Sequence, residues 1–598
     1  MRLALALFLL ALLFCLYVTG PNSSHIEASD GYLVHNLDTG LNYVTIQEAL
    51  DADETLNRHT ISVEAGTFFE HVIITKSISL NGESQETTVI DGSGTGTVLR
   101  ISADSTSVNN FTIRNGGHGS SWSSSCVYSE YCRNVWIENN IIMNATNGIV
   151  FYGLSDSAMH QNLVQGCGAM GLHLDGSSTN CSIAFNTVMD CLEGVELERC
   201  GGNFVIDNVL NRNNASIVFN SCTGSNTLRN NNLTSQMYNI IVWGPSIASF
   251  VQDVDISNKV DGKTVYYFTN AQDATLDPAN CPNAGYVAAA NCTGITIKDF
   301  NLSLNRDGLL LAQSTNCTIS NVTLSGNLGP LLHGGLTFFR STINQIVNTQ
   351  ITNSTVAICL YQSDSNLFYH NAFIDNSMQV ISDFTSPFSE PSGTRSTAEW
   401  ANGFEGNYWS NYIGFDSDND GIGNIPHVID MSNTDDHPLM GIFSSFNTSK
   451  AKQVEIISNS TIDSYNYFES NSTIRIVVSN MSVSQTHGFC RVSIPYEVMS
   501  APFRVTVDGT SPTYWNYTLY DNGTHRWIYF EYEHSTREIV IVPEFSSFLI
   551  LPSFMLVTTL ALLTILALRR IRRQNHRVDI LAFDQLNSAR ITLLRHAT

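Results

Sequence analysis

One short sequence phrase recurs at a nearly constant interval and constrains the fold of this chain more than any other feature. In residues 148–151, 171–174, 194–197 and 216–219, two apolar residues flank one variable residue, and successive phrases begin 23, 23 and 22 residues apart. Apolar residues at every second position are typical of a strand that buries one face. A fixed period of this length predicts a β-solenoid with coils of about 23 residues.

Two further ladders extend the predicted solenoid. The phrase continues at Asn239, Gly262, Gly285, Gly308, Gly335 and Ala357. Asparagines recur at Asn140, Asn162, Asn186, Asn208 and Asn231. Stacked asparagine side chains can hydrogen-bond along a solenoid axis. A short amphipathic helix at 44–50 would cap the open end. We therefore expect the solenoid to occupy residues 43–384.

The composition indicates an exported protein. Only 14% of residues are charged and the net charge is -24, which argues against nucleic-acid binding because phosphates require a basic surface. Arg2 precedes an apolar run that ends at Val18, so we expect a signal peptide in residues 1–20. Seventeen Asn-X-Ser/Thr sequons predict a glycoprotein outside the cell.

The C-terminal third changes character. Residues 385–445 read as a linker, and alternating strands in 446–542 predict a small β-sandwich. Residues 548–568 carry no charge and are long enough for a transmembrane helix. Four arginines follow at once, so the basic tail 569–598 is expected in the cytoplasm and the solenoid at the cell surface.

Several motifs resemble a known family. Gly66-Thr67-Phe68 and Ile90-Asp91-Gly92 near the start, and Gly406-Asn407-Tyr408-Trp409 after the predicted solenoid, are similar to NosD-type proteins, also grouped as CASH repeats. The block 255–293 resembles archaeal members. The resemblance covers roughly residues 43–440 and implies an all-β, right-handed parallel β-helix. Pro543-Glu544-Phe545 resembles archaeal PEF-type C-terminal surface signals, which favours a membrane anchor.

Copper is the metal associated with the NosD family, and it would require soft donors. The one visible concentration of such donors consists of Met159, His160, Cys167, Met170 and His173. These residues show no repeated ligand spacing. Copper is therefore not expected.

The predicted outward positions of the phrase collect acidic residues. His173, Asp175, Glu196 and Glu198 fall on neighbouring coils, which lie about 4.8 Å apart. Paired carboxylates at such spacing can act as acid and base on a sugar or bind Ca²⁺. The alternative is an exposed polar face without chemistry.

Aromatic residues occupy the same outward column. They are Tyr152, Trp243, Phe339 and Tyr361. Exposed aromatic rings in a line could bind sugars. Alternatively, the sandwich or the loop at 384–397 covers them.

An aspartate-rich loop follows the solenoid. Asp416, Asp418, Asp420, the Ile422 carbonyl and Asn424 have the order of calcium ligands, although His427 stands where an EF-hand needs glutamate. The loop is either a compact calcium site or a solvated Asp-Gly turn.

Four cysteines are predicted to stack in pairs on adjacent coils. The pairs are Cys167 with Cys191 and Cys200 with Cys222. Such stacking brings the cysteines within disulfide range, and stacked free thiols are the alternative.

These observations favour a membrane-anchored surface β-helix that binds glycans or other surface polymers. The main alternative is a polysaccharide lyase, epimerase or hydrolase that uses the acidic residues. Two others are a passive envelope or adhesion scaffold and a NosD-like copper accessory protein.

Overall fold

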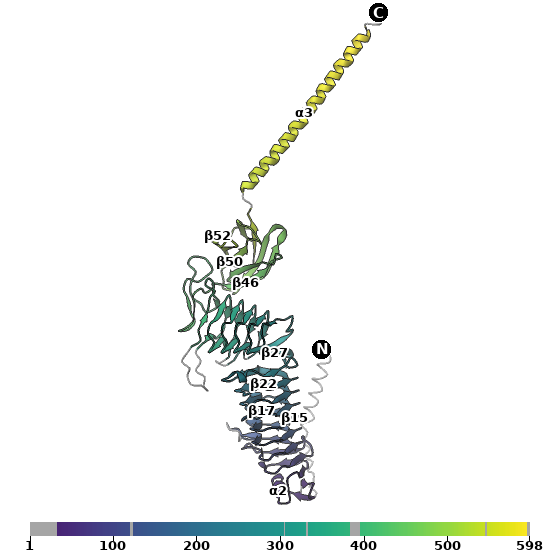
Figure 1. Cartoon of the computed structure of the whole chain (residues 1–598), viewed down its shortest axis with the longest axis vertical. Coiled ribbons are helices and arrows are strands. Elements are labelled where there is room, and N and C mark those ends of the chain that lie inside the picture. The colour runs from purple at the N-terminus through teal and green to yellow at the C-terminus, as the bar shows by residue number, and fades with distance from the viewer. Residues whose placement is uncertain are drawn as a thin grey trace. The chain divides into compact units, whose positions relative to one another are not determined.

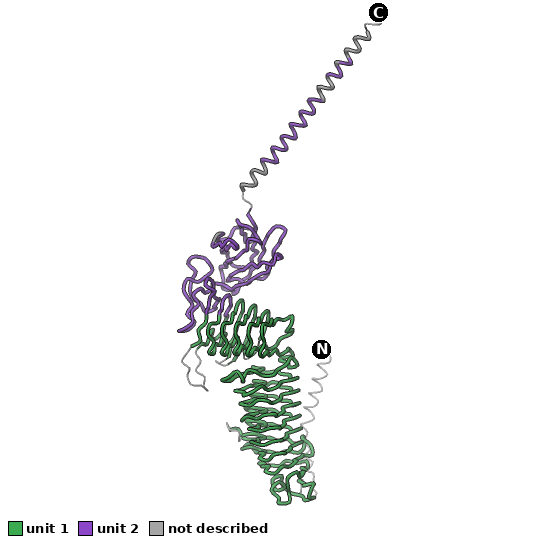
Figure 2. The backbone as a smooth tube through the Cα atoms, viewed as in Figure 1, with its two compact units in different colours: residues 1–366, 374–398 green, residues 367–373, 399–598 purple. Residues whose placement is uncertain are grey.

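The computed structural model describes residues 31, 33–119, 124–303, 305, 307–329, 333–382, 395–544 and 547–594. The predicted signal peptide at 1–20 lies outside the described residues. The chain divides into two compact units, one of residues 1–366 and 374–398 and one of residues 367–373 and 399–598 (Figure 2).

A small cap opens the first unit. β1 (Val34–Asn36) pairs antiparallel with β2 (Leu41–Tyr43) and with β3 (Thr60–Val63). The helix α2 (Ile46–Asp51) follows, and its N-cap residue Thr45 accepts a hydrogen bond from the backbone N–H of Glu48. The helix buries Ile46, Ala49 and Leu50, which confirms the predicted amphipathic helix.

Parallel strands stacked coil upon coil form the body of the first unit (Figure 1). One sheet continues from β3 through β6 (Ser79–Gly82), β9 (Ser107–Asn109), β12 (Trp136–Glu138), β15 (Ala158–His160), β18 (Ser182–Ala184), β21 (Phe204–Ile206), β23 (Thr227–Arg229) and β25 (Asp253–Val254). A second run contains β5 (Val72–Ile74), β8 (Leu99–Ile101), β11 (Ser125–Glu130), β14 (Asn147–Tyr152), β17 (Met170–Asp175) and β20 (Glu193–Glu198). A third run contains β4 (Gly66–Phe68), β7 (Thr88–Asp91), β10 (Thr112–Arg114), β13 (Ile141–Met143), β16 (Leu163–Gln165) and β19 (Thr187–Met189). The second and third runs merge in the long strands β22 (Val209–Asn220) and β24 (Asn232–Trp243). The predicted right-handed parallel β-helix is confirmed.

The asparagine ladder lies in the interior, as predicted. The backbone N–H and the side-chain amide of Asn162 donate to Oδ1 of Asn186 at 2.9 and 3.1 Å. Asn186 donates in the same way to Asn208, and the ladder continues through Asn231 to Asn258. Each buried asparagine therefore satisfies backbone groups that the turn between two strands leaves without a partner.

A hairpin interrupts the coil sequence at one place where the repeat predicts another coil. β26 (Lys259–Val260) pairs antiparallel with β27 (Lys263–Thr269). Asp261 and Gly262 form the turn with φ of 50° and 76°, the left-handed pair that a two-residue hairpin requires. Gly262 lies in the turn directly before β27, so the repeat marks the start of the next coil strand within one residue but does not predict the hairpin that leads into it.

Parallel coils resume after the hairpin. The first new run contains β27, β29 (Ala284–Ala290), β32 (Leu309–Ala312), β35 (Leu336–Phe339), β38 (Val356–Tyr361) and β41 (Met378–Ile381). The second contains β28 (Thr275–Leu276), β30 (Thr296–Lys298), β33 (Thr318–Ser320) and β36 (Gln345–Val347). The third contains β31 (Asn301–Ser303), β34 (Thr323–Ser325) and β37 (Gln350–Thr352). Three short strands contain the residues at which the chain passes from one unit to the other: β39 (Asn366–Tyr369), β40 (Ala372–Ile374) and β42 (Ala398–Glu399). The short helix η1 (Ile247–Ser249) precedes β25.

Within the second unit, two antiparallel sheets with a common apolar core occupy residues 442–543. One sheet has the order β46 (Ile442–Asn447), β47 (Gln453–Ser458), β50 (His487–Pro495), β53 (His525–Glu533) and β52 (Tyr514–Asp521). The other has the order β48 (Ser460–Phe468), β49 (Thr473–Asn480), β54 (Arg537–Pro543) and β51 (Phe503–Val507), with η2 (Glu469–Asn471) between β48 and β49. The short strands β43 (Tyr408–Trp409), β44 (His427–Val428) and β45 (Thr434–Asp435) precede them. Ile456, Ile476 and Ile528 come from both sheets and pack into one core, the arrangement expected of a sandwich.

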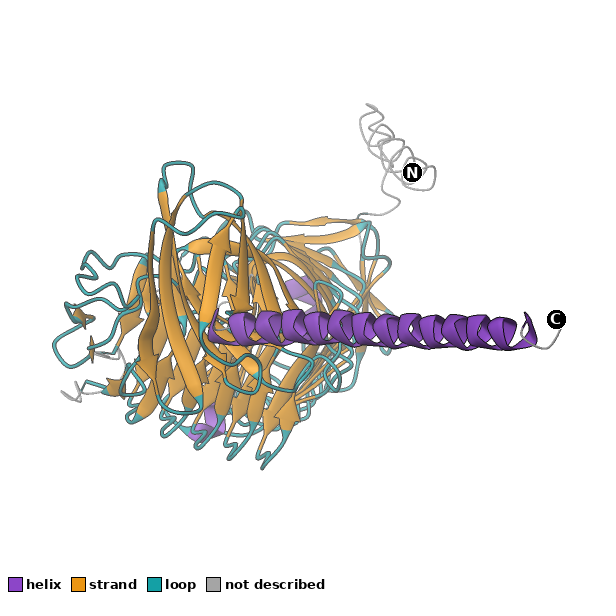
Figure 3. Ribbon diagram, turned by 90° about the horizontal axis from the view of Figure 1, so that it is seen from above, coloured by secondary structure: helices purple, strands orange, loops and turns teal. Residues whose placement is uncertain are grey.

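One helix, α3 (Ser547–Leu594), ends the described chain (Figure 3). It contains the predicted transmembrane segment 548–568 and most of the tail 569–598. Within the residues that the structure describes, no helix combines the length and the apolarity that crossing a membrane requires.

Candidate functional site

The outward face of β8, β11, β14, β17 and β20 carries two rows of functional side chains. The first row is Arg100, Tyr128, Val150, His173 and Glu196, which are register partners on successive strands. The second row is Glu130, Tyr152, Asp175 and Glu198. The residues directly before the first row, Ile149, Leu172 and Val195, point into the core. We call these two rows the outward face; they confirm that the predicted acidic residues share one side of the sheet.

An open groove of about 530 Å³ lies at the N-terminal end of the outward face. It is lined by His71, Ile73, Thr95, Gly96, Thr97, Arg100, Tyr128 and Glu130. We call it the N-terminal groove. Arg100 forms an ion pair with Glu130 and lies 5.9 Å from the centre of the Tyr128 ring. The Tyr128 hydroxyl donates to Glu130 Oε2 at 3.1 Å. Burial, together with the charge of Glu130, raises the pKa of Tyr128, so its hydroxyl remains a donor.

The sequence interpretation missed this groove. It followed the outward rows from residue 148 onward, where the phrase is most regular. The same rows continue upstream through Tyr128 and Arg100, at register positions that the parallel pairing fixes. Extending the alternation by two coils would have identified these two residues.

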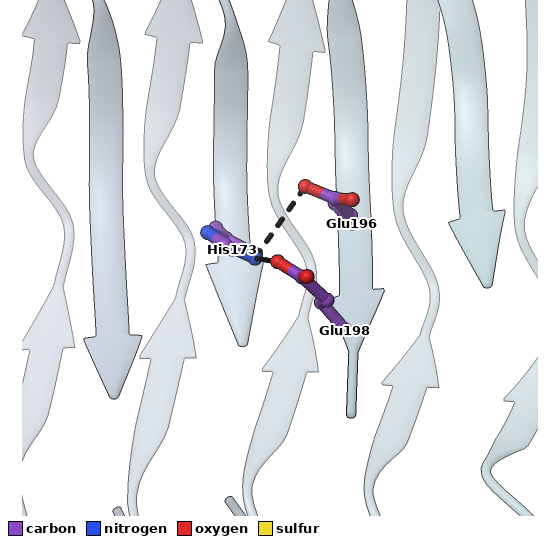
Figure 4. A group of neighbouring side chains, drawn as sticks. All are labelled: His173, Glu196 and Glu198. Carbon is purple, nitrogen blue, oxygen red and sulfur yellow. Dashed lines mark ion pairs between the residues drawn. The ribbon is translucent and has the colours of Figure 1, made fainter. Parts of the chain in front are cut away.

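Figure 4 shows the acidic part of the outward face. His173 Nε2 lies 3.4 Å from Glu196 Oε2 and 3.5 Å from Glu198 Oε2. Arg199 holds Asp175 with two bonds, from Nε to Oδ1 at 3.0 Å and from Nη2 to Oδ2 at 2.7 Å. The four predicted residues therefore form one cluster with Arg199, which the sequence interpretation did not include.

Three residues of the cluster are buried, whereas Glu198 is partly exposed and Arg199 is exposed. The alternative of an exposed polar face therefore does not describe the three buried residues. His173 and Asp175 are 0% exposed and Glu196 is 4% exposed. Side chains from neighbouring positions cover them, since Arg199 lies on Asp175 and the Asn220 amide donates to Glu196 Oε1 at 3.2 Å. Burial raises the pKa of the Glu196 carboxyl against the opposing effects of His173 and Asn220. The arrangement can orient two carboxylates or hold a cation.

Two of the four predicted aromatic ligands are buried, and Trp243 is partly buried. Phe339 and Tyr361 are buried, with their rings stacked 4.8 Å apart, and Phe250 lies 4.5 Å from Phe339. Trp243 packs against Tyr361 at 6.4 Å. Residues that precede the hairpin thus cover Phe339 and Tyr361, and the prediction of exposed aromatic rings is wrong at these two positions. Tyr152 is partly exposed and contacts the Tyr131 ring edge-on at 5.4 Å.

A buried pair that the sequence interpretation missed lies beside these rings. His333 Nδ1 is 3.0 Å from both carboxylate oxygens of Asp307, and the His333 ring is 5.8 Å from Trp243. The adjoining cavity of about 10 Å³ has room for one water molecule. Both residues lie outside the repeated phrase, so the periodicity gives no signal for them.

The aspartate-rich loop brings its three acidic side chains together. One carboxylate oxygen each of Asp416, Asp418 and Asp420 lies within 4.8 Å of the others. Burial raises the pKa of Asp416 and of Asp420. The Asn424 amide nitrogen donates to Asp418 at 2.9 Å, and its oxygen accepts from Ser417. The aspartates are therefore placed as predicted, whereas the Asn424 oxygen points to another partner. Ile422 lies in the same loop and bridges to Leu439.

The predicted cysteine pairs stack as free thiols. Cys167, Cys191, Cys200 and Cys222 are all buried and unbridged, as are the other cysteines of the described chain. The hydrogen bond to Cys191, together with burial, raises the pKa of the Cys167 thiol. The alternative of stacked thiols therefore describes the structure, and the predicted disulfides are not formed.

The soft donors considered for copper do not converge. Met159 and Cys167 are buried in the core, while His160 and His173 lie on the different sheets that contain β15 and β17. His160 instead faces Glu138, with Nδ1 3.5 Å from Oε1.

Comparisons with family models agree with the fold. A model described as right handed beta helix region matches residues 57–188 and 96–255, and a model described as periplasmic copper-binding protein (NosD) matches residues 267–414.

Two relatives illustrate the extent of similarity. A cell surface glycoprotein of Methanothermus fervidus is 24% identical over 412 residues, which cover 66% of this chain and 56% of the relative. A probable ABC transporter binding protein NosD of Stutzerimonas stutzeri is 33% identical over 131 residues, which cover 20% of this chain and 28% of the relative. The chain therefore spans about half the length of the first relative and less of the second.

Among solved structures, a family 28 exopolygalacturonase of Yersinia enterocolitica is 12% identical with a TM-score of 0.33, over 61% of this chain and 76% of that chain. The catalytic domain of a GH87 alpha-1,3-glucanase is 13% identical with a TM-score of 0.34, over 65% of this chain and 70% of that chain. Scores this low carry no information about activity. The coil geometry and the two family models together lead to one conclusion: the chain is a NosD-like, right-handed parallel β-helix protein.

Proposed function

We propose that this protein is a surface β-helix protein that binds a glycan along its outward face. The observation that carries the proposal is the N-terminal groove of about 530 Å³, which is large enough for a small ligand and open to solvent. Its position on a stack of parallel strands allows a long polymer to extend along successive coils.

The groove offers the chemistry that sugars require. The Tyr128 ring provides an apolar face for a pyranose ring, and Arg100 and Glu130 provide donors and acceptors for hydroxyl groups. His71 completes the lining, and both of its ring nitrogens are hydrogen-bonded: Nδ1 to the Thr97 carbonyl at 2.8 Å and Nε2 to the Thr95 hydroxyl at 3.2 Å. Tyr152 continues the aromatic character one coil further.

Export and surface location support a glycan ligand. The sequence carries seventeen sequons, and Asn144, Asn180 and Asn291 are exposed at left-handed turns between strands. The relative from Methanothermus fervidus is described as a cell surface glycoprotein. A location at the cell surface would place the groove among envelope polymers.

Helix α3 is the proposed attachment to the membrane. In residues 555–568 its large apolar side chains are at least half exposed, without a protein partner among the described residues. Exposed apolar surface of this extent requires cover. Alkaline carbonate extraction of membranes tests this attachment: the full chain should stay with the membrane, and a chain that ends at residue 544 should be released.

The acidic cluster favours binding over catalysis. Both Oε2 atoms of Glu196 and Glu198 face His173, and Glu196 is almost inaccessible. A glycan array with the full-length protein tests the proposal, and the absence of any ligand at millimolar sugar would reject it. Reducing-end release that Glu196→Gln abolishes would instead establish the enzymatic alternative.

A further inference from the structure

The outward face of β17 and β20 brings one imidazole nitrogen and two carboxylate oxygens to a common point (Figure 4). His173 Nε2 lies 3.4 Å from Glu196 Oε2 and 3.5 Å from Glu198 Oε2. Both glutamates belong to β20, and His173 is the register partner of Glu196 on β17. Paired strands therefore fix the spacing of the three atoms, which is the rigid support that a functional site needs.

Other side chains hold the second oxygen of each carboxylate. The Asn220 amide donates to Glu196 Oε1 at 3.2 Å, and Arg199 Nη2 lies 3.4 Å from Glu198 Oε1. Arg199 is itself fixed by its two bonds to Asp175. Metal-binding carboxylates are commonly oriented by donors behind them in this way. Each glutamate thus turns its Oε2 atom to the common point.

The cluster carries more negative than positive charge in a buried place. Glu196 is 4% exposed, and its Oε2 atom accepts no hydrogen bond in the described part of the chain. Arg199 already forms two bonds to Asp175, so it compensates Glu198 only in part, and one imidazolium cannot balance both glutamates. An uncompensated buried charge is costly. A divalent cation at the common point would balance both.

The distances and the ligand types select the class of cation. Zn²⁺ binds imidazole nitrogen and carboxylate oxygen at about 2.0–2.2 Å, so adjacent ligands of a tetrahedral site lie about 3.4 Å apart. Ca²⁺ and Mg²⁺ prefer oxygen ligands alone, whereas imidazole suits first-row transition metals. Three protein ligands leave one position open for water or another ligand.

We propose that His173, Glu196 and Glu198 bind one divalent ion of the zinc class through His173 Nε2 and the two glutamate Oε2 atoms. The site lies on the outward face but outside the N-terminal groove. Its three residues do not line that groove, so the metal proposal does not depend on glycan binding there.

Calorimetric titration of the full-length, chelator-stripped protein with Zn²⁺ in excess Ca²⁺ tests the proposal. The wild type should bind one more equivalent of Zn²⁺ than Glu196→Gln or Glu198→Gln, because each variant lacks one ligand at nearly unchanged volume. The matched control is Glu138→Gln, which removes the single carboxylate 3.5 Å from His160 and should leave the stoichiometry unchanged.

Thermal unfolding gives a second measurement. Zn²⁺ should raise the melting temperature of the wild type and of Glu138→Gln by more than it raises that of Glu198→Gln, because a ligand that binds the folded state stabilises it. Equal zinc stoichiometry in the wild type and both cluster variants would overturn the proposal. Displacement of the bound Zn²⁺ by excess Ca²⁺ would also overturn it. Neither result would affect glycan binding by the groove, so the two proposals can fail separately.

Discussion

Replacement of Arg199 by methionine should strongly destabilise the β-helix. Asp175 is fully buried, and the two bonds from Arg199 at 3.0 and 2.7 Å are its only ion pair in the described chain. Arg199→Met keeps much of the side-chain volume but leaves this carboxylate buried without a cation. Removing one partner of a buried ion pair costs about 3–5 kcal/mol of unfolding free energy. We expect the lower value, about 3 kcal/mol, because the Arg199 guanidinium is half exposed.

A matched pair elsewhere in the solenoid provides the control. Arg212 bonds to both oxygens of Asp190, at 2.9 and 2.5 Å, in the same bidentate geometry. Both side chains of this pair are about half exposed, so water replaces the lost contact when Arg212 is changed to methionine. The difference in unfolding free energy between the two variants therefore measures how much the burial of the carboxylate adds to the effect.

Urea unfolding followed by circular dichroism measures the effect. Arg199→Met should lower the transition midpoint clearly, Arg212→Met should leave it unchanged within error, and adding Asp175→Asn to Arg199→Met should recover part of the loss. Equal midpoints for the two arginine variants would refute the reasoning, because they would show that the burial of Asp175 adds nothing to the stability that its ion pair contributes.

Three further predictions concern other parts of the chain. Asn208→Ala should cost at least about 2 kcal/mol in urea unfolding, because it leaves the buried N–H of Asn186 without an acceptor, whereas Asn232→Ala, at an exposed position of β24, should be near neutral. Burial raises the pKa of Asp435 to about 6, so the folded state retains this proton to higher pH than the unfolded state. The contribution of Asp435 to stability should therefore be present below about pH 4 and be lost, by up to about 3 kcal/mol, as pH rises through about 6. The unfolding free energy of the wild type relative to that of Asp435→Asn should fall over this window, and a relative stability that rises instead would contradict the prediction. If the aspartate-rich loop binds calcium, millimolar Ca²⁺ should raise the melting temperature of the wild type but not of Asp418→Asn; an identical response of both would reject the site.

The repeat predicted the fold because one physical rule governs every coil. Alternation of apolar and variable residues fixes which side of a strand each residue faces, and stacking fixes its partners on the next coil. The register of His173 with Glu196 and the asparagine ladder follow directly from these two rules. The hairpin at Asp261 and Gly262 does not, because a turn can keep the residue spacing while reversing the chain.

Burial on the outward side could not be predicted in the same way. The alternation predicts that Phe339 and Tyr361 face away from the core of their own coils, but it does not predict which residues lie over them. Phe250 and Trp243 cover them in the structure, from coils about a hundred residues earlier. The pair of Asp307 and His333 likewise depends on segments between the repeated strands.

The affinity of groove variants for an array-identified glycan tests the central claim most directly. Tyr128→Ala should weaken binding by about tenfold or more, equivalent to about 1.4 kcal/mol, because it removes the aromatic face of the N-terminal groove. Trp136→Ala, which removes a partly exposed aromatic side chain from the sheet of β12, should bind as the wild type does. Equal affinities of Tyr128→Ala and the wild type would contradict glycan binding at this groove.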